Sequence, residues 1–455
     1  MWIRSLEFAD PFEAARRLQP LGGVAFLDSA LGDSKQSLYS FVAAAPFAEF
    51  EARPGEGDLN ALRALLARYR IAPEPDMPPF IGGAIGYFAY DFGQTLERLD
   101  RPQDWHNAAR LAYLALYDTV LAINLHSNKC FLISTGFSET LDNSSPLRDR
   151  KAQAEKRLEL FETALARAPR ALAENPLVTS FKSDFTPQTY AASIERVQNY
   201  IRAGDIYQAN IAQCFEADLP SDFDAMAFYA RLRQTNPAPF AAYLETPGQI
   251  IASSSPERFI RLQGRNVETR PIKGTARREK DPVRDAQTAA ALQASVKDRA
   301  ENIMIVDLLR NDLSRVCTPE SVNVSVLCGL ETYASVHHLV SAVTGELRTG
   351  YDALDLVAAT FPGGSITGAP KIRAMDIITE IENRLRGVYC GAIGYIGFDG
   401  AMDLNIAIRT VSIAQNRASF SAGGGITILS DAAGEYDESF AKAARLLQAF
   451  AGADT

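Results

Sequence analysis

The order of apolar runs along the chain constrains its fold more than any other feature. Helical patterns such as the one at 59–69 occur among the strand-like runs, but strands and helices do not alternate regularly. A doubly wound parallel sheet would require that alternation, so the sequence predicts an α+β fold with largely antiparallel sheets. The runs typical of strands are at residues 22–27, 80–87, 111–117, 130–134, 250–255, 391–398 and 418–428.

A boundary signal lies in the second hundred residues. Residues 142–146 (Asp-Asn-Ser-Ser-Pro) predict a turn, and a charged helical pattern follows at about 148–167. Thr186, which precedes a proline, then predicts the start of a helix, and Gly204 predicts its end. We therefore predict an N-terminal region at 1–140, a linker with a charged helix at 141–184 and a C-terminal region at 185–455.

Composition and charge exclude several classes of partner and compartment. The net charge of −9, without a basic tract, argues against nucleic acid. The five cysteines are odd in number and form no Cys-x-x-Cys pair, which favours reduced thiols over a disulfide framework or a zinc site. No apolar stretch has the length of a signal peptide core or a membrane span. We expect a cytoplasmic protein that is not associated with a membrane.

The pentapeptide Pro271-Ile-Lys-Gly-Thr275 is the first candidate for chemistry. Read alone it predicts a turn, because Pro271 fixes φ and Gly274 permits a close approach of the backbone. A lysine projecting from such a base, Lys273, is a point cation when charged and a nucleophile when its amine is desolvated and neutral. An exposed loop lysine is the alternative interpretation.

A glycine-rich run at 361–375 is the second candidate. Unpaired amides before a helix attract an anion, and the run does not end in the Gly-Lys-Ser/Thr pattern of phosphate loops. The run therefore favours binding of a carboxylate over a nucleotide, with a purely structural turn as the alternative. It supplies bare amides, two hydroxyls and a proline suited to a first helical turn: Gly363, Gly364, Gly368, Ser365, Thr367 and Pro370.

Two acidic pairs share the same helical spacing. Asp298 and Glu301 lie three residues apart, as do Glu435 and Glu438 near the C-terminus, so each pair occupies one face of its helix. A solvated acidic edge is the alternative for either helix alone. Two such pairs facing each other would offer the hard oxygen ligands that Mg²⁺ prefers.

These motifs, with others in the same order, resemble the chorismate-utilising enzymes. That family contains the anthranilate, aminodeoxychorismate, isochorismate and salicylate synthases. The resemblance runs from about Phe185 to Phe450 and implies two packed, largely antiparallel sheets flanked by helices, as in anthranilate synthase component I, with 185–455 as the chorismate-binding catalytic domain. The further matching motifs are at 204–211, 255–259, 307–312, 338–341, 391–395, 407–410 and 422–426.

The resemblance also implies a role for each site residue. Lys273 becomes the nucleophile, Glu257 the general acid, and His338 a neighbour of the substrate ring. Mg²⁺ is the implied cofactor, with Glu301 and Glu438 as closest ligands and Asp298 and Glu435 in support. The implied substrate-binding residues are Gln208, Gly274, Thr275, Ser365, Gly368, Lys371, Tyr389, Arg409, Gly424 and Lys442.

Arg409 and Lys442 are both candidates for binding the substrate, but the sequence supports Arg409 more strongly. Arg409 can bind the enolpyruvyl carboxylate of chorismate with both ends of its guanidinium. Lys442 follows Glu438 by four residues, so an ordinary helical salt bridge is an equally good interpretation.

Lys273 distinguishes between the related reactions. Aminodeoxychorismate synthases carry lysine at this position, whereas anthranilate synthases carry alanine. Gln208 replaces the lysine with which isochorismate and salicylate synthases activate water. The resemblance thus implies Mg²⁺-dependent amination of chorismate at C4, giving 4-amino-4-deoxychorismate for para-aminobenzoate and folate synthesis. Anthranilate synthase component I is the alternative activity, and a non-catalytic binding or regulatory relative is the alternative of another class.

The nitrogen donor must come from elsewhere, because no cysteine lies in a Gly-x-Cys-x-Gly elbow. The resemblance implies that a separate glutamine amidotransferase subunit supplies ammonia. It also implies a candidate tryptophan site, although Ala238 replaces the serine usual in anthranilate synthases and argues against feedback control. The residues of this candidate site are Ser29, Asn236, Pro237 and Phe240.

Overall fold

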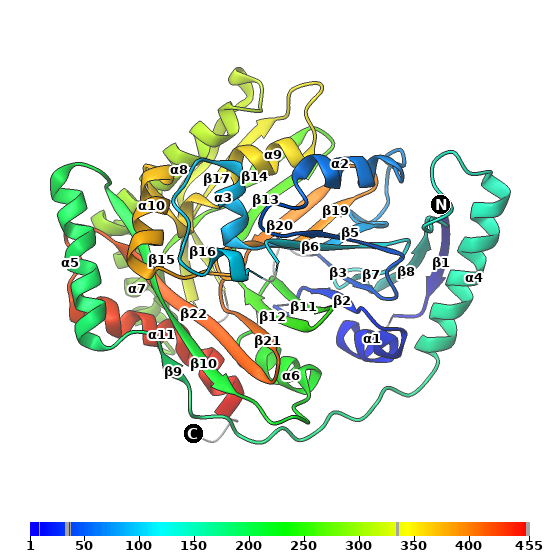
Figure 1. Cartoon of the computed structure of the whole chain (residues 1–455), viewed down its shortest axis with the longest axis horizontal. Coiled ribbons are helices and arrows are strands. Elements are labelled where there is room, and N and C mark those ends of the chain that lie inside the picture. The colour runs from blue at the N-terminus through cyan, green and yellow to red at the C-terminus, as the bar shows by residue number, and fades with distance from the viewer. Residues whose placement is uncertain (9, 32–35, 37, 109, 334–335, 452–455) are drawn as a thin grey trace.

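Two antiparallel sheets form the centre of the molecule. The structure, a computed structural model, describes residues 1–8, 10–31, 36, 38–108, 110–333 and 336–451. Within these residues the sheets contain twelve and ten strands. They lie one above the other with helices on their outer sides (Figure 1). This arrangement confirms the predicted α+β fold with two largely antiparallel sheets flanked by helices.

Both sheets combine strands from distant parts of the chain. The first sheet contains, in spatial order, β1 (Trp2–Leu6), β8 (Lys129–Ser134), β7 (Thr119–Asn124), β3 (Tyr39–Ala43), β2 (Ala25–Asp28), β11 (Phe240–Thr246), β12 (Gln249–Ser255), β21 (Thr410–Ala414), β22 (Arg417–Ile426), β10 (Gln208–Asp218) and β18 (Gly368–Ala369), with β9 (Lys182–Ser183) beside β10. The second contains β15 (Ile272–Arg277), β17 (Val336–Glu346), β14 (Asn266–Thr269), β13 (Arg258–Gln263), β20 (Met402–Ile406), β19 (Ala392–Gly397), β5 (Gly83–Phe88), β6 (Ala112–Tyr117) and β4 (Ala48–Ala52), with β16 (Asn323–Thr332) beside β17. Because β2 pairs with β11 and β5 with β19, residues 1–140 are built into the same two sheets as the C-terminal region. The division at 141–184 stays a prediction.

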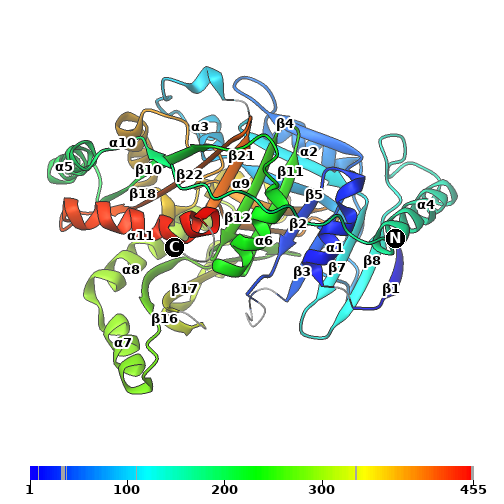
Figure 2. The same ribbon diagram turned by 90° about the horizontal axis from the view of Figure 1, so that it is seen from below.

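Helices cover the outer faces of the sheets. In Figure 1, α2, α8 and α9 lie above the sheets and α1 and α6 below, and Figure 2 shows α1, α6 and α11 across the lower face. The α-helices are α1 (Pro11–Leu18), α2 (Leu59–Ala67), α3 (Gly93–Leu96), α4 (Leu147–Leu165), α5 (Pro187–Ala203), α6 (Ala225–Thr235), α7 (Pro282–Ala294), α8 (Val296–Ser314), α9 (Ala353–Thr360), α10 (Lys371–Glu382) and α11 (Ala432–Ala451). Short 3₁₀ turns are η1 (Gln19–Leu21), η2 (Tyr90–Phe92), η3 (Trp105–Asn107), η4 (Pro319–Ser321) and η5 (Gly364–Ile366).

Apolar side chains from both sheets meet in one buried cluster. Phe41 and Ala242 of the first sheet contact the same core as Ile85 and Tyr395 of the second. The two inner faces thus exclude water from each other, which is the main favourable contribution to such packing. Separate clusters join the outer faces to their helices.

Local signals located two of the predicted helices within a few residues. The hydroxyl of Thr186 accepts a hydrogen bond from the backbone N–H of Thr189 and caps α5, and Gly204 ends the helix with φ of 84°. Helix α4 confirms the charged helix that the sequence predicts after the turn at 142–146.

The prediction for the lysine pentapeptide was wrong in one respect. Four of its five residues, 272–275, belong to strand β15 and do not form a turn. The pairing of β15 with β17 shifts between Ile272 and Thr275, so that Lys273 and Gly274 form a bulge in which Gly274 has φ of 89°. A glycine with positive φ serves a bulge as well as a turn, and a bulge redirects the neighbouring side chain.

In the described part of the chain, no helix is both long and apolar enough to cross a membrane.

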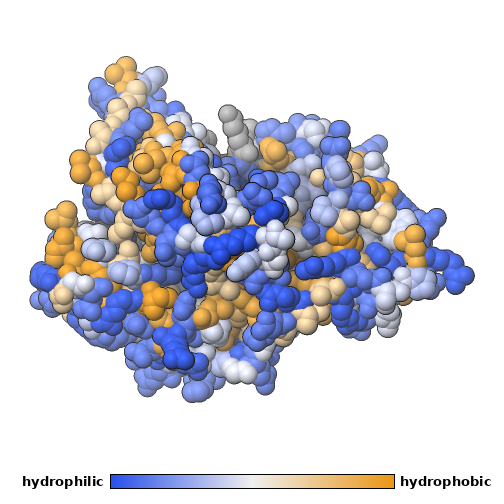
Figure 3. Space-filling view, turned by 90° about the horizontal axis from the view of Figure 1, so that it is seen from above, coloured by the Kyte–Doolittle hydropathy of each residue, from blue (hydrophilic) through white to orange (hydrophobic). Residues whose placement is uncertain are grey.

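The surface seen from above has hydrophobic residues scattered among hydrophilic ones, with a denser group towards one side (Figure 3).

Candidate active site

The bulge of β15 directs Lys273 towards the glycine-rich loop. Its Nζ donates a hydrogen bond to the backbone oxygen of Ser365 at 2.9 Å. Burial lowers the pKa of Lys273 below the ordinary lysine value, although Glu301 and Glu257 oppose the shift. A lowered pKa increases the fraction of neutral amine, which is the form that can act as a nucleophile.

Glu257 lies between β12 and β13 and is 5% exposed. The backbone N–H of Ile272 approaches its Oε1 at 3.4 Å. Burial raises the pKa of Glu257, while the Ser365 hydroxyl and the charge of Lys273 act in the opposite direction. A carboxyl group that keeps its proton more easily than usual is suited to act as a general acid.

His338 lies on β17 next to the same bulge. Its Nδ1 is 2.8 Å from the hydroxyl oxygen of Thr275. Burial, helped by the positive charge of Arg409, lowers the pKa of His338 to about 4. The ring is therefore neutral near pH 7 and can orient a hydroxyl group by hydrogen bonding.

Helices α8 and α11 bring acidic side chains from both pairs near enough for their charges to interact. Gly424 of β22 lies beside the pair on α11, because a Cβ at this glycine would be 3.1 Å from Oε2 of Glu435 and 3.8 Å from Oε1 of Glu438. Burial raises the pKa of Glu301, and the negative charges of Asp298 and Glu435 raise it further. These negative charges thus repel one another, a situation that a cation would relieve.

These carboxylates fit Mg²⁺ in their chemistry. Among the described residues, no three histidine, cysteine or acidic side chains already converge on one point. Mg²⁺ keeps several waters and needs only one or two carboxylates, so loosely gathered oxygens match its requirements. Sequence reasoning missed Lys297 of α8, whose charge favours the ionised forms of Glu301, Glu435 and Glu438. Its spacing of four residues from Glu301 was the available signal.

Arg409 supplies a cation on the other side of the site. Burial lowers the pKa of its guanidinium, with partial compensation from Glu257. No carboxylate of the described residues forms an ion pair with it, so it can bind an anion.

Gln208 and the glycines around it are packed closely. The side chain of Gln208 is buried, and its Oε1 has no hydrogen-bond partner among the residues that the structure describes. A Cβ at Gly425 would lie 1.7 Å from its Nε2, and one at Gly368 would lie 2.1 Å from its backbone oxygen. Both glycines are therefore needed for close packing against β10.

Two of the predicted substrate-binding lysines have partners within the protein. Nζ of Lys371 is buried and donates to Asp312 at 2.6 Å and to the carbonyl of Thr360 at 2.7 Å. No contact among the described residues links Lys371 to Lys273 or the acidic pairs, so it lies outside their arrangement. Lys442 forms the helical salt bridge with Glu438, at 2.8 Å.

Lys442 nevertheless borders the site, since a Cβ at Gly424 would be 3.3 Å from its Nζ. Tyr389 is buried in the core above the second sheet, and its ring centroid lies 5.8 Å from the guanidinium carbon of Arg386. The structure shows no contact of Tyr389 with Lys273 or Glu257 among the described residues.

A separate cavity of about 270 Å³ lies between the two sheets. Ser29 and Phe240 line it, together with Arg258 and Tyr395. Asn236 and Pro237 are not among its described lining residues. The structure therefore brings together two of the four residues predicted for a tryptophan site.

Comparison with known proteins places the chain in a family. The sequence model of the family described as chorismate binding enzyme matches residues 27–448. Aminodeoxychorismate synthase component 1 of Salmonella typhimurium is 43% identical over 390 residues, covering 86% of this chain and 81% of the relative. Anthranilate synthase component 1 of Streptomyces coelicolor is 37% identical, covering 90% and 80%.

The fold agrees with that placement. The crystal structure of anthranilate synthase component I from Streptococcus pneumoniae is similar with a TM-score of 0.78 and 30% identity, covering 91% of this chain and 93% of that one. The family match spans nearly the whole length and includes the lysine bulge, the glycine-rich loop and both acidic pairs. The chain therefore belongs to the chorismate-binding enzymes.

Proposed function

We propose that this enzyme aminates chorismate at C4 to form 4-amino-4-deoxychorismate, the activity named for its relative from Salmonella typhimurium. The observation that carries the proposal is the position of Lys273. Its amine has a lowered pKa and lies beside Glu257, whose pKa is raised, and Ser365 contacts both residues. A nucleophile and an acid are the two groups that a covalent displacement at C2 with loss of the C4 hydroxyl requires.

In the first step the neutral amine of Lys273 attacks C2, both double bonds of the ring diene shift, and the C4–O bond breaks. Glu257 gives its proton to the departing hydroxyl, which leaves as water, and takes up the proton that the new C2–N group loses. In the second step ammonia attacks C4, both double bonds shift back, and the C2–N bond to Lys273 breaks. Glu257 returns its proton to the lysine amine and recovers one from the new C4 ammonium group.

Other residues of the chain would hold chorismate during these steps. Arg409 would bind the enolpyruvyl carboxylate, and neutral His338 would orient the C4 hydroxyl. Mg²⁺ held by Glu301 and Glu438, with Asp298 and Glu435 nearby, would supply a Lewis acid for the ring carboxylate.

The product formed from chorismate, Mg²⁺ and ammonium tests this proposal. We expect 4-amino-4-deoxychorismate as the main product by liquid chromatography and mass spectrometry. Anthranilate is the second candidate, because relatives of that name are also similar. Anthranilate as the main product would replace the proposal, and failure to consume chorismate even with a glutaminase subunit would favour a non-catalytic relative.

We also propose that ammonia comes from a separate glutamine amidotransferase subunit, in line with the word component in the relatives' names. Cys130, Cys317, Cys328 and Cys390 are buried, and burial raises the pKa of Cys214, Cys317 and Cys390. Thiols of this kind are poor nucleophiles. A cytoplasmic location and a role in para-aminobenzoate and folate synthesis belong to the same proposal.

The isolated chain should therefore use ammonium but not glutamine. Initial rates measured with each nitrogen source should differ by about 100-fold or more, since no activated thiol is available to hydrolyse the amide. Addition of a glutaminase subunit is the positive control and should restore turnover with glutamine. Glutamine-dependent turnover by this chain alone, at a rate near that with ammonium, would contradict the prediction.

A further inference from the structure

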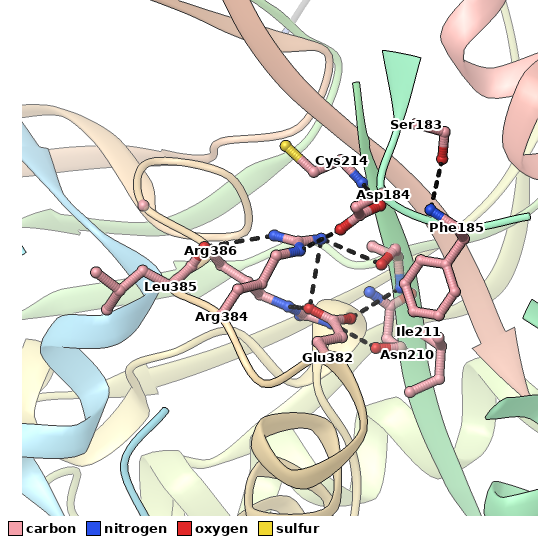
Figure 4. Close-up of polar contacts among 12 residues, drawn as sticks. Ser183, Asp184, Phe185, Asn210, Ile211, Cys214, Glu382, Arg384, Leu385 and Arg386 are labelled. Carbon is pink, nitrogen blue, oxygen red and sulfur yellow. Dashed lines mark hydrogen bonds and ion pairs between the residues drawn. The ribbon is translucent and has the colours of Figure 1, made fainter. Parts of the chain in front are cut away.

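Arg386, which the sequence did not predict as a site residue, is buried and contacts the backbone of the glycine-rich loop. Arg386 follows α10, and its side chain and that of Glu382 are each 1% exposed. Nε and Nη2 of Arg386 donate to the two carboxylate oxygens of Glu382 at 2.9 and 2.6 Å (Figure 4). The cost of removing both charges from water offsets much of their attraction, so such a pair is weak evidence of a role in stability.

The other hydrogen bonds of the Arg386 guanidinium are to two backbone carbonyls, one in the glycine-rich loop and one on the strand beside it. Nη1 donates to the oxygen of Ile366 at 3.3 Å, and Nη2 donates to the oxygen of Asn210 at 2.6 Å. Ile366 is the last residue of η5, and Asn210 lies on β10, where its N–H donates to the carbonyl of Thr367 at 2.7 Å. A planar guanidinium can satisfy these acceptors and Glu382 together, whereas an ammonium group has only three donors in another geometry.

Ser365 connects this contact to the reacting groups, because it directly precedes Ile366. Its carbonyl accepts the hydrogen bond from Lys273, and its hydroxyl lies near enough to Glu257 to lower the pKa of that carboxyl group. The orientation of η5 therefore sets the position of both the lysine amine and the glutamate carboxyl. An error of about 1 Å in the position of a reacting group can reduce a rate by about 100-fold.

We propose that Arg386, held by Glu382, is a positioning residue for the reaction. It fixes the backbone that follows Ser365 and thereby holds Lys273 and Glu257 at their reacting positions. Arg386 acts through η5 and not by contact with chorismate. This inference rests on the roles of Lys273 and Glu257 in the proposed function.

Arg386→Lys tests the proposal, with Arg384→Lys as a matched control. Arg384 lies in the same segment, approaches Glu382 at 3.6 Å and donates to the carbonyl of Ala212 at 3.1 Å. It has no contact with η5 among the described residues. We expect kcat with ammonium to fall about 30-fold in Arg386→Lys while KM for chorismate stays within about 3-fold, and both constants to stay within about 3-fold in Arg384→Lys.

A second measurement does not depend on the reaction. Hydrogen exchange of the backbone amides at 363–369, followed by mass spectrometry without substrate, should be about 10-fold faster in Arg386→Lys and unchanged in Arg384→Lys. Faster exchange with wild-type kcat would overturn the proposal, as would an effect on KM alone. If the wild type makes a product other than 4-amino-4-deoxychorismate, the proposed function fails, but kcat towards that product and the exchange rates still decide the role of Arg386.

Glu382→Gln covers the case in which Arg386→Lys does not fold. Glutamine keeps the size and one acceptor oxygen but holds the guanidinium less firmly. We expect a fall in kcat of about 5-fold with little change in KM, together with faster exchange at 363–369. Wild-type values of both quantities would overturn the proposal.

Discussion

Replacement of Lys273 by alanine is expected to lower formation of 4-amino-4-deoxychorismate by about 10²–10⁴-fold, the range for loss of a positioned catalytic group. The substitution removes the amine that would attack C2 in the proposed mechanism and introduces the residue typical of anthranilate synthases. Any remaining turnover should come from direct attack of ammonia at C2 and should shift towards anthranilate. Product analysis by mass spectrometry measures both outcomes in one experiment.

Lys273→Arg is the matched variant, because it keeps a long side chain that can donate hydrogen bonds and removes the nucleophile. A guanidinium stays protonated in proteins, so this variant should be inactive as well. Wild type mixed with chorismate and no ammonia should carry an adduct on Lys273 that neither variant forms. Wild-type output from Lys273→Ala would exclude covalent catalysis and leave Lys273 at most an electrostatic role.

Glu301→Gln and Glu438→Gln are each expected to lower activity by about 100-fold or more, since loss of a metal ligand removes several kcal/mol of transition-state stabilisation. Each variant should also bind Mg²⁺ more weakly by isothermal titration calorimetry. Asp307→Asn and Asp437→Asn are the matched controls, because they remove exposed carboxylates from the same two helices. Both controls should retain wild-type activity and Mg²⁺ affinity.

The stability of these variants without Mg²⁺ provides an independent check. The pKa of Glu301 is raised in the folded protein, so its ionised form costs stability at pH 7, and Glu301→Gln should not lower the melting temperature. Glu438→Gln loses the salt bridge to Lys442, but that pair is about half exposed, and the cost should be at most about 1 kcal/mol. Full activity of either variant at limiting Mg²⁺ would refute its role as a ligand.

The amino-acid sequence by itself determined the features that depend on neighbouring residues. The ends of α5 follow from Thr186 and Gly204, because a cap and a left-handed glycine act within a few residues. The helical spacing that places Asp298 with Glu301, and Glu435 with Glu438, is also local. The order of the motifs was sufficient to indicate the family that the comparisons then showed.

Only the tertiary structure decided which of these groups meet. Lys273 lies in a bulge and not in a turn because β17, more than sixty residues further along, pairs with its strand. Lys371 faces Asp312, and Arg386 contacts the backbone beside Ser365 through long-range packing that no spacing rule describes. Helical and turn preferences act within a few residues, whereas contacts between distant segments depend on how the two sheets pack. That packing placed Lys273, Glu257 and the acidic side chains around one site.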